Sequence, residues 1–86
     1  MLKTKTLKLG EIGRKELVEY FLKIGGITGD EEVFKGPYWE VTVGPQTWTK
    51  FSSLSIRQIL ITISVEDKMF DDFIAAFNLN FLRCGG

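Results

Sequence analysis

The sequence contains no histidine and only one cysteine, Cys84. Without imidazole, the chain lacks the commonest general base and the commonest nitrogen ligand of protein metal sites. A single thiol cannot form a disulfide within the chain, and it cannot supply a cysteine cluster for a metal. These absences predict a protein that is not an enzyme, with no catalytic residues, no metal and no cofactor.

An excess of charge of one sign and long hydrophobic runs are also absent. Eleven basic and eleven acidic side chains give a formal net charge of +0. A neutral chain lacks the field that draws proteins to nucleic acid, so we expect no nucleic-acid partner. The apolar runs are too short to span a membrane, and the first residues lack the apolar core of a signal peptide. We therefore expect a cytoplasmic protein with no membrane partner.

What is present suffices for one hydrophobic core. The 86 residues are 44% hydrophobic and 26% charged, which is typical of a single folded domain spanning residues 1–86. The last four residues, 83–86, end in two glycines and offer little surface to anchor them. We expect residues 83–86 to form a flexible glycine tail.

Two segments have the periodicity of amphipathic helices. In residues 14–24 apolar side chains recur at helical spacing, and Gly25 stands where a left-handed residue would cap the helix. A second helix is expected to begin near Asp67, because acidic residues in a first turn complement the helix dipole. Its wide apolar stripe should lie on a sheet and consists of Met69, Phe70, Phe73, Ile74, Phe77 and Phe81.

Extended segments account for the rest of the chain. The pattern predicts strands at residues 3–9, 32–34, 38–43, 46–52 and 57–65. Gly44-Pro45 is expected to form a tight turn between two of them. Short links favour antiparallel pairing. The order strand, helix, four strands, helix predicts an α+β fold in which two helices pack on one face of an antiparallel sheet.

Three polar clusters have structural explanations. The glycine-rich residues 25–29 follow a helix and lack the lysine of a phosphate loop, so a helix cap is favoured. Glu31 with Glu32, and Asp71 with Asp72, are adjacent residues that cannot easily share one proton, which favours solvated charge. The serines at positions 52, 53 and 55 have no histidine to activate them and favour turns.

Aromatic residues concentrate on the middle strands. Tyr38, Trp39 and Trp48 lie there, near the cations Lys50 and Arg57. Those on the uncovered face of the sheet would form a binding surface for a protein partner, whereas those on the covered face would belong to the core. The alternation leaves open which face each tryptophan occupies. Exposed aromatics or an unpaired edge strand would also support a homodimer.

A second class of function remains open, that of a small-ligand binding domain. Its pocket would lie between the sheet and the C-terminal helix, with the candidate lining residues Trp48, Phe70, Phe73 and Phe77. Such a pocket requires the helix to stand off the sheet. A tightly packed interior would exclude it.

The sequence closes with Gly85 and Gly86. An unhindered diglycine carboxylate fits the narrow channel of an adenylating enzyme, which excludes side chains larger than hydrogen. Activation there as an acyl-adenylate would allow transfer to sulfur or to an amine. The alternative is a flexible chain end without a function.

Several short motifs resemble a known family. They are Gly25-Gly26 after the first helix, Gly36-Pro37, the segment 53–58 that leads into an apolar strand, and the terminal glycines. Over roughly residues 7–86 they resemble the C-terminal domain of MoaD-related proteins. MoaD itself is the ubiquitin-like sulfur carrier of molybdopterin synthesis, and the function of this second domain is unassigned.

The resemblance implies a TBP-like fold with the order β-α-β4-α. It also implies a non-enzymatic accessory or interaction domain that is linked to molybdopterin or sulfur-carrier metabolism. A protein partner from that pathway is expected. The resemblance implies no catalytic residue.

Overall fold

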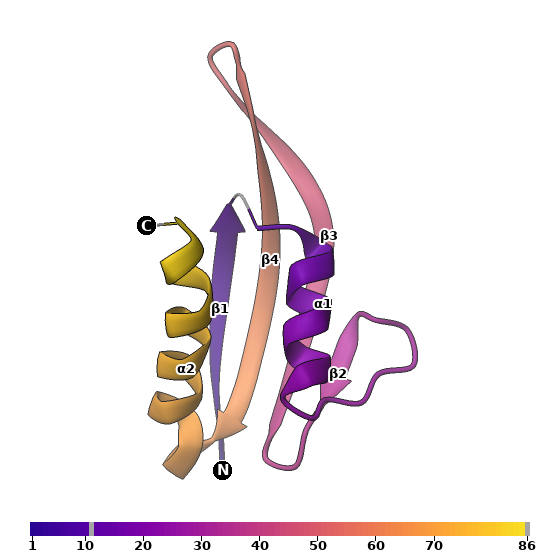
Figure 1. Cartoon of the computed structure of the whole chain (residues 1–86), viewed down its shortest axis with the longest axis vertical. Coiled ribbons are helices and arrows are strands. Elements are labelled where there is room, and N and C mark those ends of the chain that lie inside the picture. Colours follow the sequence, from indigo (N-terminus) through magenta and orange to yellow (C-terminus); the bar gives the residue numbers. More distant parts are fainter. Residues whose placement is uncertain (11, 86) are drawn as a thin grey trace.

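The computed structural model describes residues 1–10 and 12–85, with the side chains of these residues except 51 and 82–85. In chain order the elements are β1 (Leu2–Gly10), α1 (Arg14–Lys23), β2 (Val33–Lys35), β3 (Trp39–Phe51), β4 (Leu54–Glu66) and α2 (Asp67–Gly85). The described strands form one antiparallel sheet in the order β1-β4-β3-β2, and both helices lie on the same face of it (Figure 1). The predicted α+β fold is confirmed.

Gly44-Pro45 forms a β-bulge within β3, so the predicted tight turn there is wrong. Val43 pairs with Ile61 and Gln46 pairs with Ile59, so β3 carries one extra residue at this point. Proline lacks the N–H that a regular ladder needs and is tolerated at bulges. The predicted strands 38–43 and 46–52 are therefore two halves of one strand, and the bulge divides them.

The end of α1 is the glycine cap that the sequence predicts. Gly25 has a φ of 99°, in the left-handed region. Its N–H donates to the carbonyl oxygen of Leu22 at 3.1 Å, and the N–H of Gly26 donates to that of Phe21 at 2.8 Å. This pair of hydrogen bonds is the Schellman motif, which satisfies carbonyl groups at a helix end.

The acidic loop after this cap is organised by Asp30. Its carboxylate accepts hydrogen bonds from the backbone N–H groups of Glu32 at 2.8 Å and Val33 at 3.1 Å. These bonds hold the pKa of Asp30 below its usual value. The side chains of Glu31 and Glu32 are exposed, as expected for solvated charge.

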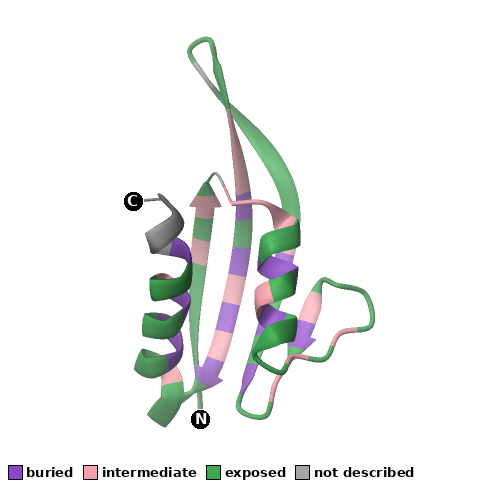
Figure 2. Ribbon diagram, viewed as in Figure 1, coloured by how far each residue is buried: buried purple, intermediate pink, exposed green. Residues whose placement is uncertain are grey.

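The core lies between the sheet and the two helices. Alternate residues of β3 and β4 face the helices, and Figure 2 shows the buried ones as separate bands along β4. Aromatic rings link the layers: the Phe21 ring of α1 stacks on Phe77 of α2 at an interplanar angle of 9°. Every described residue in the buried cluster is hydrophobic: Leu17, Val18, Phe21, Phe34, Trp39, Val41, Val43, Ile59, Ile61, Ile63, Val65, Phe73, Ile74, Phe77 and Phe81.

We predict that Gly36→Ala destabilises the fold, because the added Cβ would overlap the indole of Trp39. That indole is only 4% exposed and contacts the rings of Phe21 and Phe73, so it has little room to move. The free energy of unfolding should fall by about 1–3 kcal/mol, as for other overpacked cores. Urea unfolding followed by tryptophan fluorescence measures this change.

The matched control is Gly29→Ala, where an added Cβ meets nothing within 4 Å. This variant should change the free energy of unfolding by no more than about 0.5 kcal/mol. Equal stabilities for the two alanine variants would show that the Trp39 ring does not set the requirement for glycine at position 36.

Candidate functional site

The ends of β3 and β4 project beyond the helices as a two-stranded ribbon, which we call the hairpin arm and define as residues 46–57 (Figure 1). β2 pairs with β3 only as far as Thr42, and β1 pairs with β4 only as far as Gln58. Beyond these points, among the described residues, the two strands pair only with each other. The arm therefore has unpaired backbone edges on both sides.

The sequence explains why the arm forms. Its strands are joined by Ser52 and Ser53, and Ser52 has a φ of 61°. A positive φ at the first of two turn residues matches the right-handed twist of a hairpin. Near the base of the arm, the Thr49 hydroxyl donates to the side-chain oxygen of Gln58 at 2.8 Å, and the Thr47 hydroxyl donates to its carbonyl oxygen at 3.3 Å.

Three of the five predicted surface residues meet on one face of the arm. Trp48 pairs directly with Arg57 across the two strands, and Lys50 is the next residue of β3 on the same face. Trp48 is 64% exposed, an unusual exposure for so large an apolar side chain. Residues 46–57 contain no acidic side chain, so this face combines an indole with two cations.

The other two predicted surface residues lie elsewhere. Trp39 is in the core, so its assignment to a binding surface is wrong. Tyr38 precedes β3 at the end far from the arm and lines a depression between the helices together with Tyr20. The five residues therefore do not form one surface.

Neither tryptophan occupies the uncovered face of the sheet. In a regular strand Trp39 and Trp48 would point to opposite faces, because their separation along the chain is odd. The extra residue of the bulge reverses this relation, so both belong to the face that carries the helices. Trp48 is exposed because the arm extends beyond the ends of the helices (Figure 1).

The alternative pocket between the sheet and α2 is not formed by the residues proposed to line it. Phe73 is packed against Trp39, with ring centroids 5.3 Å apart, and Phe77 is 1% exposed. Phe70 is half-buried beneath the ammonium group of Lys3, and Trp48 is on the arm. Of these four residues, Phe73 also lines the depression of about 140 Å³ between the helices that Tyr38 and Trp39 border.

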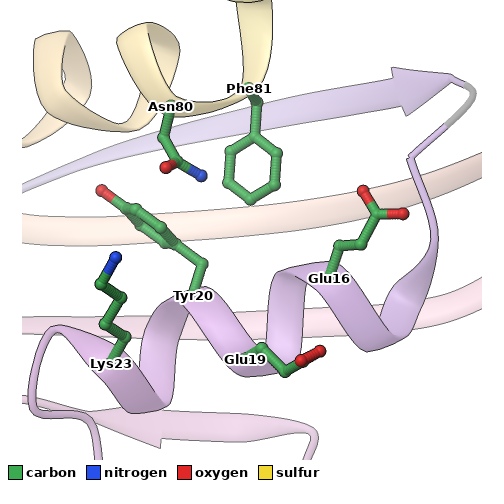
Figure 3. Close-up of a pocket in the computed structure, with 6 residues that line it drawn as sticks. All are labelled: Glu16, Glu19, Tyr20, Lys23, Asn80 and Phe81. Carbon is green, nitrogen blue, oxygen red and sulfur yellow. The ribbon is translucent and has the colours of Figure 1, made fainter. Parts of the chain in front are cut away.

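Between the two helices lies a surface groove that the sequence analysis did not predict. A depression of about 290 Å³ is lined by Glu16, Glu19, Tyr20, Lys23, Asn80 and Phe81 (Figure 3), and we call it the interhelical groove. The rings of Tyr20 and Phe81 extend into it from facing helices, with centroids 5.2 Å apart. Its existence depends on the distance between the helices, which periodicity does not reveal.

Among the described ionisable groups that line this groove, Tyr20 is the one whose pKa is raised. Burial raises the pKa of its hydroxyl, and nearby Tyr38 raises it further. The ring also contacts Phe77 edge-on, at a centroid distance of 5.7 Å. The tyrosine therefore belongs partly to the core and partly to the groove.

We predict that Tyr20 contributes to the loss of stability at alkaline pH. An ordinary tyrosine ionises near pH 10. Because the folded-state pKa is raised, the unfolded chain loses this proton first. Stability is therefore complete below about pH 10 and falls as the pH rises towards the folded-state pKa. Tyr20→Phe should lose less stability than the wild type between about pH 8 and pH 11 in urea unfolding.

Tyr38→Phe serves as the control for this comparison. It removes the smaller cause of the shift and leaves the burial of Tyr20, so it should keep most of the alkaline loss. An identical pH dependence in Tyr20→Phe and the wild type would contradict the assignment to Tyr20.

Two features are absent from the part of the chain that the structure describes. No helix there is long and apolar enough to cross a membrane. No group of three or more His, Cys, Asp or Glu residues is arranged there to hold a metal ion.

The fold and its surfaces define a small α+β domain with helices on one face of its sheet and an exposed hairpin arm. The sequence model of the archaeal MoaD-like protein family matches residues 5–86, and the chain belongs to that family. The resemblance inferred from the short motifs is thereby confirmed. Comparison with curated proteins gives no match.

Proposed function

We propose that this MoaD-related domain is a non-enzymatic interaction domain that serves molybdopterin or sulfur-carrier metabolism. Its contact surface is the hairpin arm. Family membership supports the link to the pathway. The observation that carries the mode of action is the exposed indole of Trp48 beside Arg57 on a ribbon with two unpaired edges.

Physical chemistry favours the arm as a binding surface. Trp and Arg are the residues that most often dominate the energy of protein interfaces. Burial of apolar surface stabilises a complex by about 25 cal/mol per Å², so a partner that covers the exposed indole would gain a large binding free energy. An isolated two-stranded ribbon is only marginally stable in water, and a partner that covers the arm would stabilise it.

The distribution of ionisable groups supports binding over catalysis. The sequence has no histidine to act as a general base near neutral pH. Asp30 is engaged in holding its own loop, and Asp71 and Asp72 are exposed along α2. Asp30 lies in the loop before β2, whereas Asp71 and Asp72 lie on α2.

We predict that Trp48→Ala prevents the protein from retaining its pathway partners. Tagged protein is expressed in its native host, and co-purifying proteins of molybdopterin and sulfur-carrier synthesis are quantified by mass spectrometry. Loss of a central indole typically weakens binding by about 2 kcal/mol or more, so retention should fall more than about tenfold.

Leu79→Ala is the matched control, because Leu79 is an equally exposed apolar residue, 65% against 64% for Trp48, on α2 and away from the arm. It should retain the same proteins as the wild type. Enrichment of no protein from these pathways by the wild type would contradict the proposal. Equal retention by Trp48→Ala would place the contact elsewhere.

Activation of the terminal glycine remains a separate prediction. α2 includes Gly85, and Gly86 lies outside the described residues, as do the side chains of the expected 83–86 tail. If the carboxylate of Gly86 is activated, intact-protein mass spectrometry of material from the native host should detect a thiocarboxylate. Gly86→Ala should reduce it, since the channel of an adenylating enzyme excludes larger side chains. A wholly unmodified carboxylate, while carriers of the pathway are thiocarboxylated, would contradict this prediction.

A further inference from the structure

We propose that the hairpin arm binds a second copy of this chain, in a reciprocal dimer. Trp48 and the arm cations of each copy occupy the interhelical groove of the other copy. This inference rests on the proposed function in one respect, which is that the arm is the contact surface. It names a second copy of the chain as the molecule that covers the arm, and pathway proteins then bind the dimer so formed.

The shape of the chain favours this arrangement. The helices cover the body of the sheet and stop short of the arm, which is left as a single layer (Figure 1). On the helix side of the arm there is thus a step, about as deep as the diameter of a helix, roughly 10 Å. A second copy turned through a two-fold axis places its own helix pair in that step.

The groove has the size and lining to receive an aromatic side chain. The rings of Tyr20 and Phe81 are in edge contact with each other and line a depression of about 290 Å³, so an indole placed there would meet them edge-on or in offset stacks. The arm offers the matching group, because the indole of Trp48 is 64% exposed and faces the step. The groove thus offers an aromatic-lined depression, and the arm offers an aromatic side chain that could fill it.

The charges of the two surfaces are complementary. Lys50 and Arg57 give the arm two positive charges and no negative one. The groove carries the carboxylates of Glu16 and Glu19 with one cation, Lys23. The adjoining depression between the helices adds a third carboxylate, that of Asp72. Opposite charges at such an interface steer association and fix its register.

Two-fold symmetry would limit the assembly to two copies. The arm and the groove lie on the same side of the sheet, so two copies placed face to face and antiparallel form both arm–groove contacts at once. A closed two-fold arrangement stops at a dimer. It also leaves the uncovered face of each sheet, with Thr6, Thr42 and Thr62 in one cross-strand row, free for other partners.

Charge reversal provides the test. The arm variant combines Lys50→Glu with Arg57→Glu, and the groove variant combines Glu16→Lys with Glu19→Lys. Sedimentation velocity of the full chain should show a dimer for the wild type, with each variant alone at least tenfold weaker in self-association. An equimolar mixture of the two variants should form a heterodimer. In it the negative arm of one variant meets the positive groove of the other, and the second contact joins the wild-type arm to the wild-type groove.

Two controls accompany this experiment. Lys8→Glu reverses a charge on the uncovered face of the sheet and should leave the dimer intact, since Lys8 faces away from the helices. Trp48→Ala should weaken the dimer at least tenfold without reversing any charge. Circular dichroism of every variant establishes that the fold is retained.

Three results would overturn the inference. The first is a wild-type monomer at protein concentrations up to about 1 mM. The second is a dimer that the arm variants leave unchanged. The third is a dimer lost in the arm variant and retained in the groove variant, which would mean that the arms pair with each other.

These outcomes are separate from a failure of the proposed function. If the wild type is a monomer and Trp48→Ala loses the pathway proteins, the dimer is refuted and the proposed function stands. If the wild type is a dimer but retains no pathway protein, the dimer stands and the proposed function is refuted.

Discussion

The contact of the two helices with each other and with the first residue of β3 is the constraint on which the structure depends. The Phe21 ring lies against both Phe77 of α2 and Trp39 of β3, at centroid distances of 5.9 Å and 5.8 Å. This ring therefore fixes the spacing of the helices and their height above the sheet. The same indole excludes a Cβ at Gly36, so the packing of one tryptophan dictates the glycine of a neighbouring turn. The interhelical groove is the space that this spacing leaves above the rings.

A single extra residue determines what the other end of the sheet can do. Up to the bulge, alternate residues of β3 are covered by helices, and beyond it no helix reaches. By reversing the alternation, the bulge assigns Trp48 and Lys50 to the helix side of the arm and Thr47 and Thr49 to the other side. A glycine fits the site because a Cβ at Gly44 would lie 2.8 Å from the carbonyl oxygen of Leu60.

Features that depend on local periodicity could be predicted from the sequence. The 3.6-residue repeat located both helices, the alternation in residues 57–65 identified the covered face of β4, and Gly25 marked the end of α1. Gly44-Pro45 was misread because glycine and proline signal a turn and a bulge equally well, and only the strand pairing distinguishes them. The face occupied by Trp48 and the existence of the groove depend on that pairing and on helix spacing, which are properties of the fold and not of a local segment.

The two tryptophans show how one fold separates stability from recognition. Both belong to the same face of the sheet, yet Trp39 is 4% exposed and Trp48 is 64% exposed, because helices cover one and not the other. The body already buries an apolar cluster built from all the layers, so the fold does not need a second indole in its core. A large apolar side chain that is kept in water beside two cations lowers the solubility of a monomer without stabilising it. Its position is explained if the surface that completes its burial comes from another molecule, and a helix pair with an acidic groove has the shape and charge to do so.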